Sequence, residues 1–191
     1  MESIRVHLPE DLRMNDDEFT RFCQDNPDLK FERRKNGDIV FMANTGWDTG
    51  NKNFEISADF GIWNRQAKFG KFFDSSTAFR LPDTSIMSPD VSAISQSRWD
   101  LLTPEQRRKI VPLCPDFILE LKSPNDRMKD AKEKMTDWMA NGCRLGWLID
   151  PDEQKTYIYR PNQEPQEVSG MGQLSGEDVL PGFTLDLTVP G

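Results

Sequence analysis

The chain has 191 residues, of which 36% are hydrophobic, and it contains five Trp and twelve Phe. This apolar content excludes an intrinsically disordered chain and predicts a single domain, residues 1–191, with a substantial core. The 24 basic residues are outnumbered by 32 acidic ones, for a formal charge of -8. The chain therefore lacks the bulk positive charge of proteins that bind nucleic acid non-specifically.

Several other classes of protein are excluded by features that the sequence lacks. No run of about 18 apolar residues could span a membrane, and the charged N-terminus does not resemble a signal peptide, so we expect a cytoplasmic protein with no membrane contact. The three cysteines, Cys23, Cys114 and Cys143, are far apart and predict reduced thiols. The single histidine, His7, lies in a segment expected to be exposed, which argues against a zinc site or a His-based triad.

The first elements expected along the chain are a helix and a hairpin. Asn15 precedes three acidic residues, a pattern typical of a helix N-terminus, and this helix should end at the next Asn-Pro pair. Segments 29–32 and 38–42 flank an Asn-Gly pair at 36–37, which is a strong hairpin signal. Glu32 lies in the first of these strands, either as an exposed strand charge or as an auxiliary active-site carboxylate.

A long helix and a strand are expected next. Residues 45–53 resemble a polar loop, and residues 52–68 predict an amphipathic helix. The apolar positions that suggest this helix are Phe54, Ala58, Ile62 and Ala67. Residues 71–81 are rich in Phe and predict a strand that ends at a Pro-Asp pair.

Two further Pro-Asp pairs follow. Asp90 belongs to the first and lies within the short apolar segment 86–94. Between the two pairs, Thr103 followed by Pro and Glu predicts the start of a helix in the segment 98–110. Asp116 belongs to the second pair, where we expect a residue that begins a strand rather than a ligand.

The site is expected around the strand that begins at Phe117. This strand is apolar for three residues and then carries Glu120 and Lys122. Because side chains alternate along a strand, these two charges share one face. Charged groups on a buried strand are costly to desolvate. Two interpretations stay open, a structural ion pair or an acid and a base positioned for chemistry.

The last third of the chain predicts a strand, helix, strand crossover. Apolar residues recur at helical spacing in 126–140, and 145–149 is a fully apolar strand, so this strand and the one at Phe117 should run parallel. Segment 155–160 predicts a hairpin partner, 161–172 a polar loop and 183–189 a terminal strand.

Asp90, Glu120 and Lys122 are the residue types that metal-assisted phosphodiester hydrolysis requires. Two carboxylates can hold Mg²⁺, which usually keeps several waters. The ion polarises the phosphodiester and activates water. A neighbouring lysine can orient or deprotonate that water, or stabilise charge that develops on the phosphate.

This pattern resembles the signature of the PD-(D/E)XK nuclease superfamily, in which a Pro-Asp pair precedes an acid and a lysine two residues apart. The similarity is wider than the signature and covers roughly residues 15–187. In particular, four stretches look like the Uma-type endonuclease family, which is abundant in cyanobacteria: 79–82, 88–91, 115–123 and 141–151.

The resemblance implies an α/β fold, a restriction-endonuclease-like core with a mixed central β-sheet flanked by helices. It implies that Asp90 and Glu120 are metal ligands and that Lys122 is the catalytic lysine. Glu32 would match the acid near the family's first hairpin. Lys134 would match a helical lysine that projects into the site, although helical lysines are usually solvated.

We therefore expect a Mg²⁺- or Mn²⁺-dependent endonuclease acting on DNA, as a homodimer whose two sites cut the two strands. The alternative is a catalytically inactive nuclease-fold binding or regulatory module, which the acidic charge favours. A third interpretation is a structural Glu120–Lys122 pair without a ligand. The sequence departs from the family at 50–53, where Gly-Asn-Lys-Asn replaces a region in which a His is common.

Overall fold

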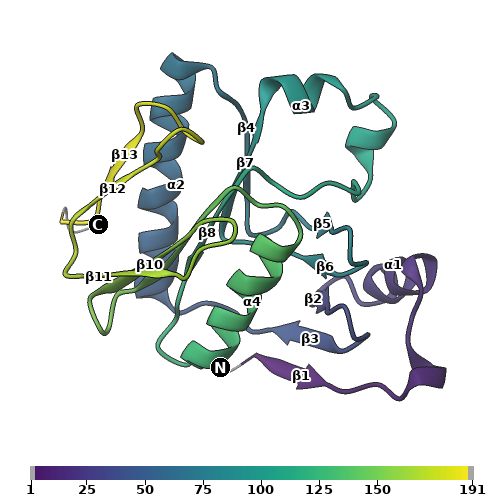
Figure 1. Ribbon diagram of the computed structural model, residues 1–191. Helices are drawn as coiled ribbons and strands as arrows, with labels where there is room; N and C mark the ends of the chain where they lie inside the picture. Colours follow the sequence, from purple (N-terminus) through teal and green to yellow (C-terminus); the bar gives the residue numbers. More distant parts are fainter. Residues whose placement is uncertain (1–2, 189–191) are drawn as a thin grey trace.

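The computed structural model describes residues 3–188 and is built around a six-stranded sheet (Figure 1). The strand order is β11-β10-β9-β8-β7-β4, with β8 and β9 parallel and the other neighbours antiparallel. The central sheet is therefore mixed, as predicted. Its strands are β4 (Gly70–Asp74), β7 (Val91–Ser95), β8 (Phe117–Leu121), β9 (Leu145–Asp150), β10 (Lys155–Tyr159) and β11 (Gln166–Ser169).

The crossover between β8 and β9 is the helix α4 (Met128–Ala140), as expected from the sequence. This helix packs on one face of the sheet through Met135 and Trp138, which are both fully buried. Their neighbours on the sheet include Ile118 of β8 and Leu148 of β9. One face of the central sheet is therefore covered by α4.

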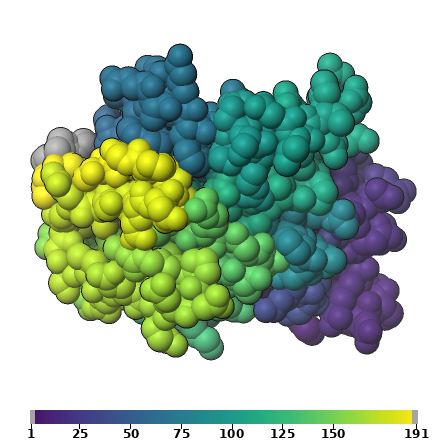
Figure 2. Space-filling view, turned by 45° about the horizontal axis from the view of Figure 1, so that its top comes forward, coloured from purple at the N-terminus to yellow at the C-terminus, as the bar shows by residue number. Residues whose placement is uncertain are grey.

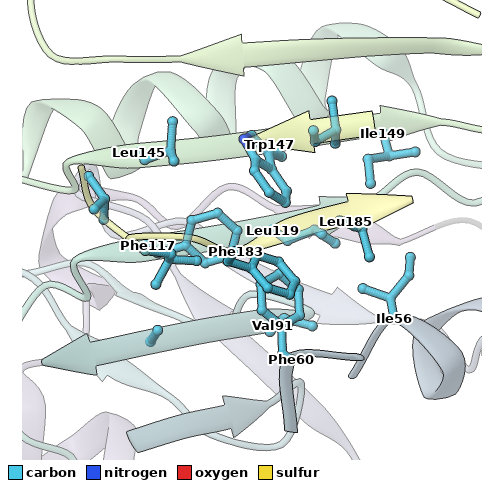
Figure 3. Close-up of a cluster of buried hydrophobic side chains, with 14 of the residues drawn as sticks. Ile56, Phe60, Val91, Phe117, Leu119, Leu145, Trp147, Ile149, Phe183 and Leu185 are labelled. Atoms are coloured by element: carbon cyan, nitrogen blue, oxygen red, sulfur yellow. The ribbon is translucent and has the colours of Figure 1, made fainter. Parts of the chain in front are cut away.

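The opposite face is covered by helix α2 (Trp47–Ala67) and by a C-terminal hairpin of β12 (Gln173–Ser175) and β13 (Thr184–Asp186) (Figure 3). Phe60 of α2 stacks on Phe183 with ring centroids 4.4 Å apart, and it also contacts Phe117 of β8 at 5.3 Å. Side chains of β8 alternate, so Phe117 and Leu119 belong to this core while Ile118 belongs to the other. Helices thus flank the sheet on both sides.

Helix α2 differs from the prediction in its start and in its buried face. It begins at Trp47, so most of the stretch 45–53 is helical rather than a polar loop. Ile56 is buried, whereas Phe54 is 69% exposed and Ile62 is 55% exposed. The face that packs is selected by aromatic partners from distant segments, which helical periodicity alone does not reveal.

A second sheet of five strands lies beside the first, in the order β1-β3-β2-β6-β5. Strands β2 and β3 form the predicted hairpin. Helix α1 (Asp16–Asp25) buries Phe19 against this sheet, and Asn15 and Glu18 form a capping box at its start. The strands are β1 (Ile4–Val6), β2 (Lys30–Arg33), β3 (Ile39–Met42), β5 (Phe79–Arg80) and β6 (Ile86–Met87).

The segment 71–81 is two strands rather than one. Strand β4 ends at Asp74, whose side chain accepts hydrogen bonds from the Ser76 N–H at 3.0 Å and from the Ser76 hydroxyl. This turn breaks the strand, and β5 then joins the second sheet.

The helix expected from Thr103 does not form beyond a single turn. The segment instead contains a short helix α3 (Gln96–Asp100) and a 3₁₀ turn η2 (Gln106–Arg108). Thr103 and Gln106 exchange backbone and side-chain hydrogen bonds, but β-branched residues and Pro112 follow at once. The cap is therefore present without an extended helix.

The C-terminal part contains one strand that the sequence does not predict. Strand β11 lies within 161–172, which was expected to be only a loop. A separate hairpin is formed by β12 (Gln173–Ser175) and β13 (Thr184–Asp186). The predicted terminal strand thus ends at Asp186, and its last expected residue, 189, lies outside the described residues.

The first and the last described segments of the chain lie on different sides of the molecule. In the space-filling view the C-terminal segment lies against α2, and the N-terminal segment, which includes the 3₁₀ turn η1 (Glu10–Leu12), lies at the far side (Figure 2). Among residues 3–188, none of the helices is long and apolar enough to cross a membrane.

Candidate active site

The candidate site lies where β7 begins beside the end of β8. Asp90 immediately precedes β7, and its Oδ2 accepts a hydrogen bond from the Leu121 N–H at 2.7 Å. The antiparallel ladder pairs Val91 with Leu119, so Leu121 lies just beyond its end. The Asp90 carboxylate therefore accepts the hydrogen bond that the Leu121 N–H would otherwise donate to a neighbouring strand. This bond holds Asp90 beside β8.

Glu120 points from β8 toward α4. Its Oε1 accepts a hydrogen bond from the Trp138 indole N–H at 3.1 Å and lies 2.9 Å from the Lys134 ammonium. Lys134 and Trp138 are four residues apart and so lie on one face of the helix. The carboxylate is thus oriented by two donors that come from the same helix face.

Lys134 is buried, contrary to the expectation that a helical lysine is solvated. Its ammonium lies 2.8 Å from Glu32 Oε1 and donates to the Ser88 carbonyl oxygen at 2.8 Å. With Glu120 this makes three acceptors around one charged group, so the burial of Lys134 is compensated. The ammonium joins β2, β8 and α4 at a single point.

Glu32 is 1% exposed, so the interpretation as an exposed strand charge is wrong. Besides Lys134, its Oε1 accepts a hydrogen bond from the Ser88 N–H at 3.0 Å. Its Oε2 lies 3.6 Å from a guanidinium nitrogen of Arg34, and within residues 3–188 it accepts no hydrogen bond. Glu32 therefore belongs to the buried polar cluster beside Glu120.

Lys122 shares a face with Glu120 but points to a different partner. Its ammonium lies 3.6 Å from Asp150 Oδ1 and 3.8 Å from Asp152 Oδ2. Asp150 ends the neighbouring parallel strand, one residue beyond the Leu121–Ile149 pair. The hypothesis of a structural Glu120–Lys122 ion pair is therefore wrong, because Glu120 pairs with Lys134.

The cluster shifts the pKa of each carboxylate. Burial raises the pKa of Glu120 to about 7, although Lys134 opposes the shift. Burial also raises the pKa of Asp90, while the Leu121 N–H opposes it. For Glu32, burial acts in the same direction, but Lys134 and Arg34 outweigh it and lower the pKa. Burial disfavours the charged form of Lys134, but Glu120 and Glu32 outweigh it and raise its pKa.

Asp90, Glu120 and Lys134 line one cavity of about 580 Å³ that extends to the start of α2. A smaller adjoining pocket is lined by Glu32, Glu120, Lys122 and Lys134. The structure therefore brings four of the predicted residues into one connected cluster. Lys122 borders the smaller pocket with its ammonium turned toward the end of β9.

The carboxylate oxygens at this site suit a divalent cation that needs few protein ligands. Within the described part of the chain, no group of three or more His, Cys, Asp or Glu side chains is arranged to hold a metal. Asp90 Oδ1 has no hydrogen bond, and no Lys, Arg or His of residues 3–188 lies within 4 Å of this carboxylate. Two carboxylates completed by water and substrate phosphate are the usual environment of Mg²⁺.

Sequence reasoning missed three residues of the cluster. Trp138 is expected only as an apolar helix residue, yet its indole N–H bonds to Glu120. Ser88 contributes its backbone N–H and carbonyl groups, which leave no trace in the sequence. Arg34 lies two residues after Glu32 on the hairpin. A signal did exist for Trp138, the four-residue spacing from Lys134.

The second Pro-Asp pair is not part of the site. Asp116 precedes β8, at the opposite end of the strand from Glu120. It accepts hydrogen bonds from the Arg98 guanidinium at 2.7 Å and from the Ser95 N–H at 2.8 Å. This confirms its placement at the beginning of a strand. His7, as expected, is largely exposed, with its side chain beside Asp38.

The mixed sheet, the helices on both faces and the acidic cluster at the end of β8 together define a nuclease fold. The structure is similar to a crystal structure described as a "putative nuclease belonging to DUF820" from Anabaena variabilis, with a TM-score of 0.76 and 21% sequence identity. The match covers 90% of this chain and 94% of the other. At this identity, the likeness establishes the fold.

The family follows from the sequence itself. A family model described as "Uma2: Putative restriction endonuclease" matches residues 16–189. The chain belongs to this family, which supports a nuclease function. No curated protein sequence matches the chain.

Proposed function

We propose that the protein is an endonuclease that hydrolyses DNA phosphodiester bonds with Mg²⁺ or Mn²⁺. The observation that carries this proposal is the convergence of Asp90 and Glu120 on one cavity beside a buried lysine. Asp90 keeps an oxygen without a protein partner among residues 3–188, and Glu120 Oε2, whose one partner among these residues is Lys134, has a further lone pair. Asp90 and Glu120 would hold the ion, which would supply Lewis-acid activation of the phosphodiester and of the attacking water.

The protein groups around the ion have separate tasks in this proposal. Lys134 and Trp138 hold the Glu120 carboxylate in one orientation, and Glu32 holds Lys134. Lys122 is the proposed catalytic lysine, which orients the attacking water or stabilises charge that develops on the phosphate. Its ammonium must turn from Asp150 toward the phosphate to do so, which its flexible side chain permits.

A homodimer is part of the proposal. Each chain offers one set of Asp90, Glu120 and Lys122, and hydrolysis at one such site cuts one strand. Two copies would cut both strands of a duplex. Equilibrium sedimentation with and without DNA measures this directly, and a monomer in both conditions would contradict a dimeric enzyme.

Calorimetric titration of Mn²⁺ tests the metal site. The wild type should bind the ion, and Asp90→Asn and Glu120→Gln should each lose this binding. Asp116→Asn is the matched control, because it changes the other Pro-Asp pair at the opposite end of β8. Absence of binding by the wild type, with DNA present to complete the coordination, would refute the metal-dependent site.

The alternative is a nuclease-fold binding or regulatory module without activity. The observation that favours it is that Lys134 contacts both oxygens of Glu120, at 2.9 and 3.1 Å, and so competes with a cation for this carboxylate. A cleavage assay on supercoiled plasmid separates the two functions. Metal binding without cleavage by the wild type would support the module, whereas cleavage lost in Asp90→Asn supports the enzyme.

A further inference from the structure

Trp47 is the most exposed large hydrophobic residue of the described chain, at 96%. Two other tryptophans, Trp138 and Trp147, are fully buried in the cores. An indole ring is large and mostly apolar, so its complete exposure at the first residue of α2 has no folding benefit. The ring is available to a ligand.

This ring lies on the same cavity as the proposed active site. The cavity lining runs from Trp47 and its neighbour Asn44 to Asp90 and Glu120. In a nucleic-acid strand whose phosphodiester lies at Asp90 and Glu120, the adjacent nucleotides would therefore lie toward the start of α2. The backbone position of Trp47 is set by a 21-residue helix that is anchored in the core by Phe60, so the ring is attached at a fixed point relative to the site.

The charge of the cavity favours a contact that does not depend on phosphate attraction. Its charged lining consists of four acids and two lysines: Asp48, Asp90, Glu120, Asp126, Lys30 and Lys134. Of the two lysines, Lys134 is already bonded to Glu32 and Glu120. Affinity for a nucleic acid must then come in part from neutral groups, and a base stacked on an aromatic ring is such a contact.

We propose that Trp47 stacks on an unpaired nucleobase of the nucleic acid whose phosphodiester lies at Asp90 and Glu120, so that the substrate is single-stranded or locally melted. This inference rests on the proposed nuclease function. Bases in an intact duplex are covered on both faces by their neighbours, so only an unstacked base can present its face to the ring. The stacking contact thereby selects strands with unpaired nucleotides.

Fluorescence anisotropy tests the contact. The probes are labelled oligothymidylate and oligouridylate of equal length and a labelled duplex, in EDTA and at low ionic strength so that no strand is cut. The wild type should bind the single strands more tightly than the duplex. Trp47→Ala should weaken single-strand binding about tenfold, and Trp47→Phe should retain most of it. Loss of binding by Trp47→Ala to either single strand supports the contact.

Phe54→Ala is the matched control. Phe54 is 69% exposed, lies two helical turns beyond Trp47 on the same helix and does not line the cavity. This variant should bind as the wild type does. Tryptophan emission gives a second readout, because oligothymidylate should quench the wild type and the quenching should be lost in Trp47→Phe, which keeps the other four tryptophans.

Three results would overturn the inference: wild-type protein that binds no single strand, Trp47→Ala that binds as well as the wild type, or equal losses for single strand and duplex. Its failure is distinguishable from failure of the proposed function. Asp90→Asn should lose cleavage but keep Trp47-dependent binding. Wild type that cleaves nothing yet shows this binding would refute the nuclease and leave the stacking contact standing.

Discussion

The Lys134 ammonium lies 2.8 Å from Glu32 Oε1, and the two side chains are 8% and 1% exposed. Lys134 comes from the helix that packs on the six-stranded sheet, and Glu32 comes from the second sheet. This buried ion pair therefore connects the two sheets at the candidate site.

Lys134→Met should destabilise the protein by about 3–5 kcal/mol, because it leaves Glu32 and Glu120 buried without their shared cation. The free energy of unfolding in urea measures the effect. The control is Lys129→Met, at an exposed position of the same helix, where the change should stay within about 0.5 kcal/mol. Equal effects of the two substitutions would contradict the structural role of Lys134.

Lys122→Ala should lower the rate of plasmid cleavage by about 10²–10⁴-fold, the range expected when an acid or base is removed from the site. The variant should keep Mn²⁺ binding, because Asp90 and Glu120 are unchanged. Lys155→Ala, which removes an ion pair with Glu167 on the sheet edge, is the control and should cleave as the wild type does. A fully active Lys122→Ala would show that this lysine only pairs with Asp150.

The three thiols should differ in reactivity. Burial raises the pKa of Cys114 to about 12 and that of Cys143 well above its usual value, and both side chains are within the core. Cys23 is half-buried, and its pKa is also raised by burial. Ellman's reagent at pH 8 should therefore modify Cys23 alone in the native protein and all three thiols in guanidinium. Rapid modification of two or three native thiols would contradict this packing.

Asp83 should make stability depend on pH. Burial acts to raise the pKa of this carboxyl, but hydrogen bonds from Asn141 and Ser85 outweigh it and lower the pKa. The folded state then binds this proton less readily than the unfolded chain. The resulting stabilisation is complete above the unfolded pKa of about 3.9 and is lost as the pH falls through the lower folded pKa.

Asn141→Ala removes the hydrogen bond to the Asp83 carboxylate, and also the bonds of Asn141 to the Asp83 N–H and the Asp137 carbonyl oxygen, and should cost about 2–4 kcal/mol at pH 7. The difference in the free energy of unfolding between the wild type and this variant should narrow below about pH 4, where Asp83 becomes protonated. Urea unfolding at several pH values measures the gap. The control Asn51→Ala, at an exposed position of α2, should show a small gap that does not change with pH, and a constant gap for Asn141→Ala would refute the assignment.

The elements whose signals are local could be predicted from the sequence. The capped helix at Asn15, the Asn-Gly hairpin and the parallel crossover around α4 all form as expected. Glu120 could also be selected, because a charge at the end of an apolar strand is conspicuous in the sequence alone. Each of these features depends on residues that are near one another in the chain.

Tertiary structure alone decided which partners meet at the site. The sequence contains Glu32, Lys122 and Lys134, but only packing shows that Glu120 pairs with Lys134 rather than with Lys122. The same holds for the buried face of α2, which is selected by distant aromatic rings. Periodicity shows that a helix has an apolar side, whereas the side that is buried depends on which surfaces from elsewhere in the chain are left to cover it.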